Sequence, residues 1–478
     1  MIARHVPIAA AVVVALFAAP AARATVPDMF YGVNAQNVFD SSNSNWGPQL
    51  AAMSAGGLQL ARYDARWQNV EPNAPSSGHH TYNWSKYDSV VTALAQHNIR
   101  WYPIIDYSTS WAGVIKGDSN SEVAQNHVAD FATYANVFAQ RYGRGGSFWK
   151  AHPNLPQLPV LQYEIWNEEN ADLFLHPQTN APEHFADLYM AARAAIKPVD
   201  PQADVVVGGL ALGTQGGGVD EITFLQRMFA HRPDMRGNVD AIGLHPYQAD
   251  VPNTEARIAA FRTAVDQLAG PSVPIEVTEV GWSTLSVSET ERANDLSALA
   301  QDLPRSDCNI TRMITYSWTS PEQNRSRADD WFGIYNHNAT PKPSATAFLG
   351  TVKTMRGLSG AAAPTGNVAI CHPNAPAAVQ PAPPKLRLRF ALGRGHSRLR
   401  VVAKCPTGCR LNLVLLAPRP GAPVRVGHRT ARFSKRTRVF KFRITHRLRR
   451  RFATVQLQVT AIAPSGVQTS RTRTVHIR

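Results

Sequence analysis

The most constraining feature of the sequence is a regular alternation of short apolar segments with longer segments of helical periodicity. Eight such units follow one another in about 330 residues, and a long amphipathic pattern such as Ser121–Tyr142 separates consecutive apolar segments. Strands that alternate with helices form a parallel sheet, and eight units close it into a (β/α)8 barrel. An open doubly wound sheet is the alternative, but no glycine-rich phosphate-binding loop follows the first apolar segment, Met29–Asn34. We therefore expect an α/β chain built on a (β/α)8 barrel.

Two of the apolar segments end in glutamate. The fourth, Leu161–Asn170 (LQYEIWNEEN), is apolar like a buried parallel strand and then turns polar at Asn167 and Glu168. The seventh, Pro274–Trp282 (PIEVTEVGW), carries Glu279 near its end. The carboxyl ends of barrel strands meet at one mouth, where the chemistry of this fold lies. Two carboxyl groups there can serve as the proton donor and the nucleophile or base that glycosidic cleavage needs.

Other strand ends complete a recognisable set. Arg62 ends the second strand, His245-Pro246-Tyr247 the sixth and Trp318 the eighth. With Asn167-Glu168 and Glu279 in the expected order, residues 28–358 resemble the retaining glycosidases of glycoside hydrolase clan A. The stretches RYDARWQNVEP, YNWSKYD and IIDYSTSWAG look most like family 39 and the endo-glycosidases linked to bacterial exopolysaccharides.

The resemblance implies a role for each polar residue of the set. Glu168 would be the acid/base, held protonated by apolar neighbours that raise its pKa. Glu279 would be the nucleophile, kept ionised and oriented by Arg62 and by the hydroxyl of Tyr247. Asn167 would hydrogen-bond the 2-hydroxyl of the sugar, a contact that tightens in the transition state.

Aromatic side chains are implied as platforms for sugar rings, whose C–H faces pack on aromatic faces. Trp318 is the first candidate and Trp111, in the loop after the third strand, is the second. Trp111 could equally be a core residue of its loop. His245 could contact the substrate or be a buried histidine with satisfied hydrogen bonds.

The catalytic residues also have alternative interpretations. Glu169 could replace Glu168 as the acid, although a shift of one residue reverses the direction of a side chain in a strand. Glu279 could be a structural salt-bridge partner, and Arg62 could simply pair with Asp64.

The predicted function is that of a retaining glycosidase, a hydrolase that cleaves O-glycosidic bonds of a poly- or oligosaccharide by double displacement. The resemblance implies no metal and no other cofactor. Two alternatives stay open: a transglycosylase that uses the same carboxyl pair, and a non-catalytic carbohydrate-binding protein on a degenerate barrel.

The first 24 residues have the pattern of a secretory signal peptide. Arg4 and His5 precede an apolar run that ends near Ala19, and Ala22-Arg23-Ala24 is a small-residue cleavage site. An uncleaved anchor is the alternative, but the run is shorter than the roughly 20 residues that a membrane span needs. We expect a secreted protein without a transmembrane segment after cleavage, with retention at the cell surface as a variant of this prediction.

Four cysteines fit an oxidising compartment. Cys405 and Cys409 enclose a short turn and are expected to form a disulfide. Cys308 and Cys371 would then form the second disulfide. A zinc site is the weaker alternative, because no histidine lies at ligand spacing near Cys405 and Cys409.

An uneven distribution of charge marks the domains. Residues 385–478 contain 24 of the 49 lysine and arginine residues and none of the 34 acidic residues. We expect a catalytic barrel at 25–358, a Pro/Ala-rich linker at 359–384, and a basic immunoglobulin-like β-sandwich at 385–478.

The basic domain is expected to bind an anionic polymer of the cell surface through long-range attraction. The alternative is that its solvated strand faces are simply rich in arginine. Nucleic acid is not an expected partner, because the segment has no helical basic patch of the kind that reads grooves.

Overall fold

The computed structural model describes residues 26–41, 45–212, 217–371, 387–393, 397–404, 409–417, 424–433, 437–462 and 468–477. The predicted signal peptide at 1–24 lies outside these residues, as does Cys405, and with it the predicted Cys405–Cys409 disulfide. Within the described ranges, no helix has the length and apolar character that crossing a membrane requires.

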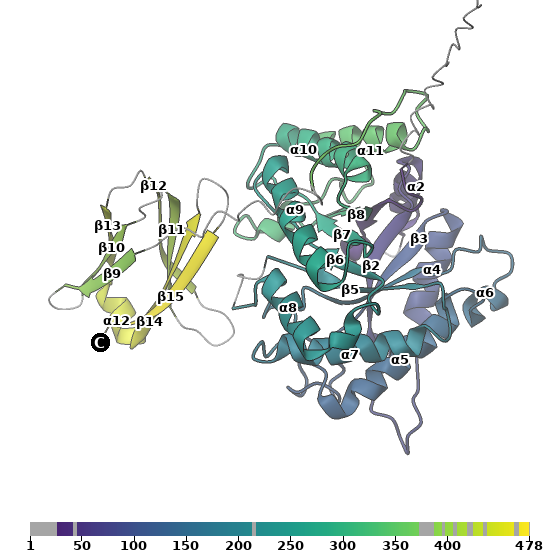
Figure 1. Cartoon of the computed structure of the whole chain (residues 1–478), viewed down its shortest axis with the longest axis horizontal. Coiled ribbons are helices and arrows are strands. Elements are labelled where there is room, and N and C mark those ends of the chain that lie inside the picture. The colour runs from purple at the N-terminus through teal and green to yellow at the C-terminus, as the bar shows by residue number, and fades with distance from the viewer. Residues whose placement is uncertain are drawn as a thin grey trace, which may run out of the picture.

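Eight strands close into a barrel in sequence order (Figure 1). All neighbouring pairs are parallel, including the pair of β8 with β1 that closes the ring. The (β/α)8 prediction is confirmed. The barrel strands are β1 (Tyr31–Asn34), β2 (Leu60–Arg66), β3 (Arg100–Asp106), β4 (Gln162–Asn167), β5 (Asp204–Leu210), β6 (Ala241–Leu244), β7 (Ile275–Val280) and β8 (Ile310–Thr315).

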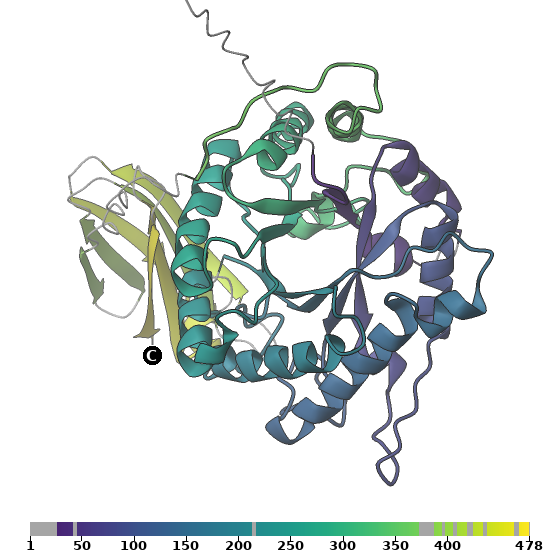
Figure 2. The same ribbon diagram turned by 45° about the vertical axis from the view of Figure 1, so that its right-hand side comes forward.

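Helices surround the strands (Figure 2). One long helix follows each of the strands β2 to β8, and short helical turns lie in the loops. The α-helices of this part are α1 (Gln36–Phe39), α2 (Gly47–Ala55), α3 (Trp67–Val70), α4 (Ser85–Gln96), α5 (Val128–Tyr142), α6 (Ser147–Ala151), α7 (Ala181–Ile196), α8 (Glu221–His231), α9 (Val251–Leu268), α10 (Glu289–Asp302) and α11 (Pro343–Met355). The 3-10 turns are η1 (Gln125–His127), η2 (Pro233–Met235), η3 (Leu303–Arg305) and η4 (Ala328–Trp331).

One helix starts later than the sequence pattern predicts. The periodicity begins at Ser121, but α5 begins at Val128. The backbone explains the difference, because the carbonyl of Glu122 accepts a hydrogen bond from the N–H of Val114, and Val123 forms a β-bridge with Gly113. These residues therefore belong to the loop after β3 and not to the helix.

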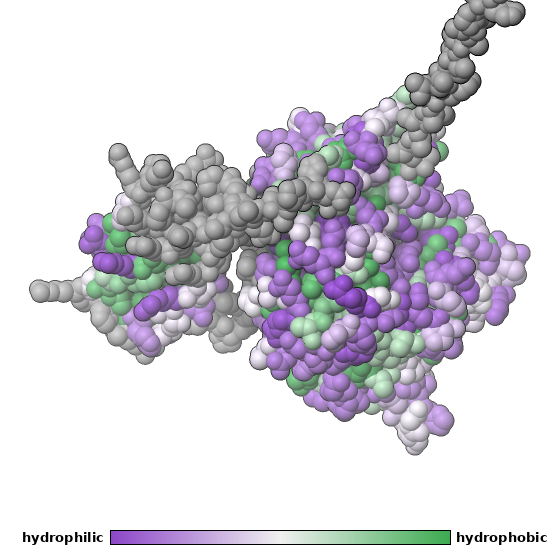
Figure 3. All heavy atoms as spheres, viewed as in Figure 1, coloured by the Kyte–Doolittle hydropathy of each residue, from purple (hydrophilic) through white to green (hydrophobic). Residues whose placement is uncertain are grey.

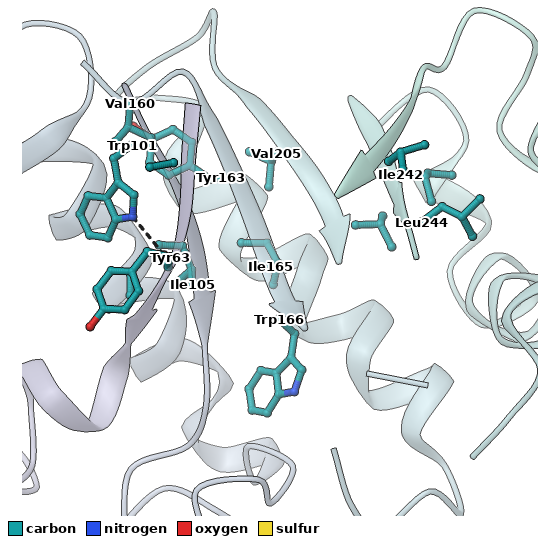
Figure 4. Packing of buried hydrophobic residues seen from close by; sticks show 14 of the residues in the cluster. Tyr63, Trp101, Ile105, Val160, Tyr163, Ile165, Trp166, Val205, Ile242 and Leu244 are labelled. Atoms are coloured by element: carbon teal, nitrogen blue, oxygen red, sulfur yellow. Dashed lines mark hydrogen bonds between the residues drawn. The ribbon is translucent and has the colours of Figure 1, made fainter. Parts of the chain in front are cut away.

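The main core lies between the strands and the helices. Outward-facing residues of neighbouring strands, such as Ile105, Ile165 and Val205, are fully buried there (Figure 4). The indole N–H of Trp101 donates to the carbonyl of Tyr63 at 3.0 Å, so this polar group is satisfied inside the apolar layer. On the surface, apolar residues form small areas between polar ones (Figure 3).

A disulfide ties the end of the barrel region to the barrel. Cys308 and Cys371 are bonded, as predicted, and Val368 forms a β-bridge with Ser306 beside them. The first part of the predicted linker, up to Cys371, therefore lies against the barrel. The boundaries of the domains stay a prediction.

The basic segment folds into two antiparallel sheets, confirming an all-β domain (Figure 1). One sheet has the order β13-β10-β9 and the other β12-β11-β14-β15. Their inner faces share one apolar cluster, so the sheets pack as a sandwich. The elements are β9 (Arg387–Leu392), β10 (Arg398–Lys404), β11 (Cys409–Ala417), β12 (Val424–Phe433), β13 (Thr437–Arg443), the short helix α12 (His446–Arg451), β14 (Thr454–Ile462) and β15 (Gln468–His476).

Candidate active site

Glu279, on β7, is the most heavily hydrogen-bonded carboxylate of the barrel mouth. Arg62 of β2 donates to its Oε1 at 2.5 Å, and Asn34 of β1 donates to the same oxygen at 3.2 Å. The hydroxyl of Tyr247 donates to Oε2 at 2.8 Å. These donors come from β1, from β2 and from the segment after β6, and they favour the ionised form of the group. Arg62 was expected to end the second strand, but β2 continues from Arg62 to Arg66.

Arg62 is fully buried and distributes its guanidinium over three acceptors. Besides Glu279, its Nε donates to Glu164 of β4 at 2.6 Å and its Nη2 donates to Asn167 at 2.8 Å. Asp64 pairs with Arg66 instead. Arg62 therefore does not pair with Asp64, which was the structural alternative. A buried cation with two carboxylate partners fixes the geometry of this side of the mouth.

Glu168 has a different environment from Glu279. It follows the last residue of β4, and its side chain keeps 16% of its surface exposed. Its Oε1 lies 2.8 Å from Nδ1 of His245, and Nε2 of His245 lies 3.1 Å from the hydroxyl of Thr278. A Cβ at Gly209 would lie 2.0 Å from His245 Nε2, so only glycine leaves room for this imidazole.

The two carboxyl groups lie close to each other. One oxygen of Glu168, one oxygen of Glu279 and one ring nitrogen of His245 are all within 4.8 Å of one another. Such a triad could hold a metal ion, but the donors from Arg62 and Tyr247 already occupy both oxygens of Glu279. The arrangement suits a pair of carboxyl groups that act on the two atoms of one substrate bond.

Burial sets the protonation states of the site. It raises the pKa of Glu168 to about 8, an effect that the Arg62 charge opposes and the Asp329 charge reinforces. It also raises the pKa of Glu279, against the opposing effects of Arg62 and of the Tyr247 hydrogen bond. Burial lowers the pKa of His245 to about 4, so its imidazole is neutral near pH 7. With this pKa, Glu168 is mostly protonated at neutral pH.

The structure brings most of the predicted site residues together. Asn167 lies beside Arg62 with 9% of its surface exposed, and Tyr247 contacts Glu279. Arg62 and His245 were predicted among the substrate-binding residues, but both are fully buried. They act on the two catalytic candidates and present no surface to a sugar.

Trp318 does not fit its predicted role as a sugar platform. Its side chain is fully buried, its indole N–H donates to Gln49 at 2.6 Å, and its ring stacks on Tyr335 with centroids 3.9 Å apart. A ring covered in this way has no free face for a sugar. Trp111 is partly buried and packs edge-on against Trp67, with its N–H directed at the carbonyl of Glu71.

Tyr316, which the sequence pattern did not single out, occupies the place at the mouth that Trp318 was expected to fill. Its ring is partly exposed and packs against Tyr247 and Phe332, with centroids 6.2 and 5.3 Å away. Burial and the nearby charge of Glu279 raise the pKa of its hydroxyl. The available signal was its position directly after Thr315, the last residue of β8.

Glu169, the alternative acid, is fully buried. Neither of its oxygens has a hydrogen-bond partner among the described residues, and its Oε2 lies 2.3 Å from where a Cβ of residue 208 would be. Its side chain lies beside Gly208, whereas the oxygens of Glu168 and Glu279 lie near the ring of His245, which is beside Gly209. The geometry therefore favours Glu168 as the acid.

Comparison with known proteins finds similarity of fold to solved structures but no match by sequence. No family model and no curated protein matches the sequence. Solved structures of similar fold include a family 39 glycoside hydrolase from Bacteroides cellulosilyticus WH2, with 15% identity, coverage of 86% of this chain and 80% of that chain, and a TM-score of 0.53. A family 39 β-xylosidase from Caulobacter crescentus has 18% identity, coverage of 82% and 84%, and a TM-score of 0.51. A glucosidase from Croceicoccus marinus has 13% identity, coverage of 88% and 94%, and a TM-score of 0.51.

Proposed function

We propose that the chain is a secreted glycosidase that hydrolyses O-glycosidic bonds with retention of anomeric configuration. The observation that carries the proposal is the approach of the Glu168 and Glu279 oxygens within 4.8 Å. Retaining enzymes place their carboxyl groups about 5–5.5 Å apart, whereas inverting enzymes leave about 6.5–9.5 Å for a water molecule. The similarity in fold to family 39 enzymes supports the same reaction class.

In the first step, the Glu279 carboxylate attacks the anomeric carbon and a covalent glycosyl ester forms. The bond from that carbon to the leaving oxygen breaks, and Glu168 delivers its proton to this oxygen. Arg62 and Tyr247 hold Glu279 in position for the attack. The raised pKa of Glu168 keeps the proton available at neutral pH.

In the second step, water hydrolyses the ester and Glu168 acts as the base. It accepts one proton from the water, the hydroxyl adds to the anomeric carbon, and the Glu279 carboxylate leaves. Glu168 therefore alternates between an acid and an anion during each turnover.

His245 can match both states of Glu168, because a neutral imidazole has one donor and one acceptor nitrogen. When Glu168 is protonated, its hydroxyl donates to Nδ1 and the Nε2 proton donates to Thr278. When Glu168 is ionised, the Nδ1 proton donates to Glu168 and Nε2 accepts the proton of the Thr278 hydroxyl. The distances of 2.8 and 3.1 Å permit either pattern.

Substrate contacts follow from the groups that remain free. The Oδ1 atom of Asn167 accepts from Arg62, which leaves its amide N–H groups for a sugar hydroxyl. Tyr316 offers a partly exposed ring next to Glu279, and we propose it, in place of Trp318, as the aromatic contact of the sugar. Trp111 is retained as a candidate contact further along the loop after β3.

The test is an activity screen on aryl glycosides and bacterial polysaccharides with the wild-type chain and Glu279→Gln. The amide keeps the size of the side chain but cannot form the ester, so turnover should fall to the limit of detection. Glu169→Gln is the matched control and should retain activity. Full activity of Glu279→Gln would refute the nucleophile assignment, and binding of a glycan that neither protein cleaves would favour a carbohydrate-binding protein.

A further inference from the structure

The outer face of the three-stranded sheet of the C-terminal domain carries a grid of exposed cations. Arg398 of β10 lies opposite Arg443 of β13, and Arg400 lies opposite Lys441. Arg389 of β9 lies on the same face, in register with Val402. All five charged residues are exposed. We refer to these residues, Arg389, Arg398, Arg400, Lys441 and Arg443, as the cationic face.

Such a face is unfavourable for the domain on its own. Side chains directly opposite each other on neighbouring strands lie about 4.5–5.5 Å apart at Cβ, and like charges at this distance repel. Residues 385–478 contain no aspartate or glutamate, so no carboxylate side chain of the domain offsets the repulsion. Two like-charged pairs stacked along one ladder, Arg398–Arg443 and Arg400–Lys441, are most simply explained by an external anion.

The second sheet has fewer like-charged pairs in sequence along its ladder. Its outer face includes Asn412, His428, Gln456, Gln458 and Thr474. The register also sets Arg410 of β11 opposite Arg432 of β12, but the next pair along that face is Asn412 with Thr430. The cationic face differs because two like-charged pairs follow each other on one ladder.

The remaining exposed groups indicate the class of partner. Val439 is the one large apolar side chain on the described part of this face that is notably exposed, at 43%. Phe390, Phe440 and Phe442 belong to the inner cluster. A membrane surface would call for apolar or aromatic side chains that enter the bilayer, and single-stranded nucleic acid would call for aromatic stacking platforms. A hydrophilic polyanion needs neither.

We propose that the cationic face binds a linear anionic polysaccharide, one that carries carboxylates at regular intervals. The guanidinium groups of Arg398, Arg400 and Arg443 can each bind a carboxylate with two parallel hydrogen bonds. Residues two apart on a strand are about 6.6 Å apart, so the ladder offers repeated sites along one chain. The choice of a polysaccharide over other polyanions rests on the proposed glycosidase function, and the face would hold the barrel close to an acidic glycan matrix.

The test measures binding of polygalacturonate to the full chain in the Glu279→Gln background, so that the polymer is not consumed. Binding is expected at about 0.1 M salt, where the screening length is about 10 Å, and should be lost near 1 M, where it is about 3 Å. Methyl-esterified polygalacturonate has the same backbone without the charge, and it should not bind. Equal binding of the ester would overturn the proposal.

The residue assignment is tested by neutralising the face and comparing it with a control of equal net charge. The face variant combines Arg398→Gln, Arg400→Gln, Lys441→Gln and Arg443→Gln, and should bind about tenfold more weakly or worse. The control replaces four exposed barrel cations with glutamine: Lys116, Lys150, Arg236 and Arg325. The control should stay within about twofold of the parent; an equal loss in both variants would show an effect of net charge only and overturn the assignment.

Two further measurements test the stability of the face variant and the choice of a polysaccharide as the partner. The face variant should unfold at the same or a higher temperature, because it removes like-charge repulsion; if it unfolds at a lower temperature, the double variant Arg400→Gln/Lys441→Gln replaces it. Anionic phospholipid vesicles and duplex DNA are measured at the same salt. Tighter binding to either than to polygalacturonate would refute the polysaccharide. Binding needs no catalytic turnover, so it can succeed where the glycosidase screen fails.

Discussion

The barrel mouth and the cationic face differ in whether the protein itself compensates their charges. At the mouth, Arg62 is fully buried and all three of its donor nitrogens have acceptors, two of them carboxylates. On the cationic face, Arg398 and Arg400 are exposed and face other cations. A buried charge must be compensated within the protein, because water cannot solvate it. Water solvates an exposed charge, so a like-charged neighbour costs little free energy. The exposed charge also remains available to bind an external anion.

The comparison predicts that changes at the mouth have large effects and that changes on the face have small ones. The effect on activity is largest for the catalytic carboxyl groups. Glu168→Gln should lower kcat by about 10²–10⁴-fold for substrates with poor leaving groups, the usual contribution of a general acid. Aryl glycosides with acidic phenols need less protonation, so their first step should lose much less. A uniform loss across a series of leaving groups would contradict the acid role of Glu168.

Removal of the buried cation is expected to have the largest effect on stability. Arg62→Met leaves Glu164 and Glu279 buried without their partner, and should lower the free energy of unfolding by about 3–5 kcal/mol. Lys86→Met is the control at an exposed ion pair. Both Lys86 and Asp40 are partly exposed, at 41% and 31%, so the loss of Lys86 should cost about 1 kcal/mol or less. Chemical denaturation of both variants checks the difference, and equal losses would break the distinction between buried and exposed charge.

The pH dependence should show a window that lies higher than that of unperturbed carboxyl groups. Activity needs Glu168 protonated, so kcat/KM should fall about tenfold per pH unit above pH 8. It also needs Glu279 ionised, so the rate falls on the acid side as pH drops below its raised pKa. Glu168→Gln should remove the alkaline limb and keep the acid limb. An alkaline limb that survives in this variant would belong to another group.

The smallest effect is expected on the cationic face. Arg400→Glu places a carboxylate opposite Lys441 and should raise the free energy of unfolding by about 0.2–1 kcal/mol, while it weakens binding of the polyanion. Gln458→Glu on the other outer face lies opposite Val414 and Thr472, and should leave both properties nearly unchanged. A loss of stability on Arg400→Glu would show that the like-charged pairs are not repulsive in the folded domain.

Local patterns in the sequence were sufficient for the order of the barrel elements and for the carboxyl pair. Asn167-Glu168 and Glu279 end strands whose period and length are readable, and the barrel brings such ends together whatever the loops do. The Cys308–Cys371 disulfide was also predicted and is present. The barrel features depend on patterns within a few residues and on the rule that strand ends meet, whereas the disulfide followed from pairing the two cysteines that remained after Cys405 and Cys409.

Features that depend on long-range packing could not be predicted in the same way. Glu164 looks like one polar residue in an apolar strand, and its partner Arg62 is 102 residues away. Alternation of side chains holds only within a strand, and β8 ends at Thr315. Tyr316 and Trp318 lie after the strand, so alternation does not set the direction of their side chains. The chain turns there, and Trp318 is buried against Tyr335 while Tyr316 lies at the mouth.

The most direct test of the carboxyl pair is the configuration of the first product. A glycoside that the chain cleaves is hydrolysed in an NMR tube, and the anomeric proton of the released sugar is followed before mutarotation. Double displacement through Glu279 predicts that the product forms first with the anomeric configuration of the substrate. First appearance of the opposite anomer would mean direct attack by water, and would contradict the assignment of Glu279 as the nucleophile.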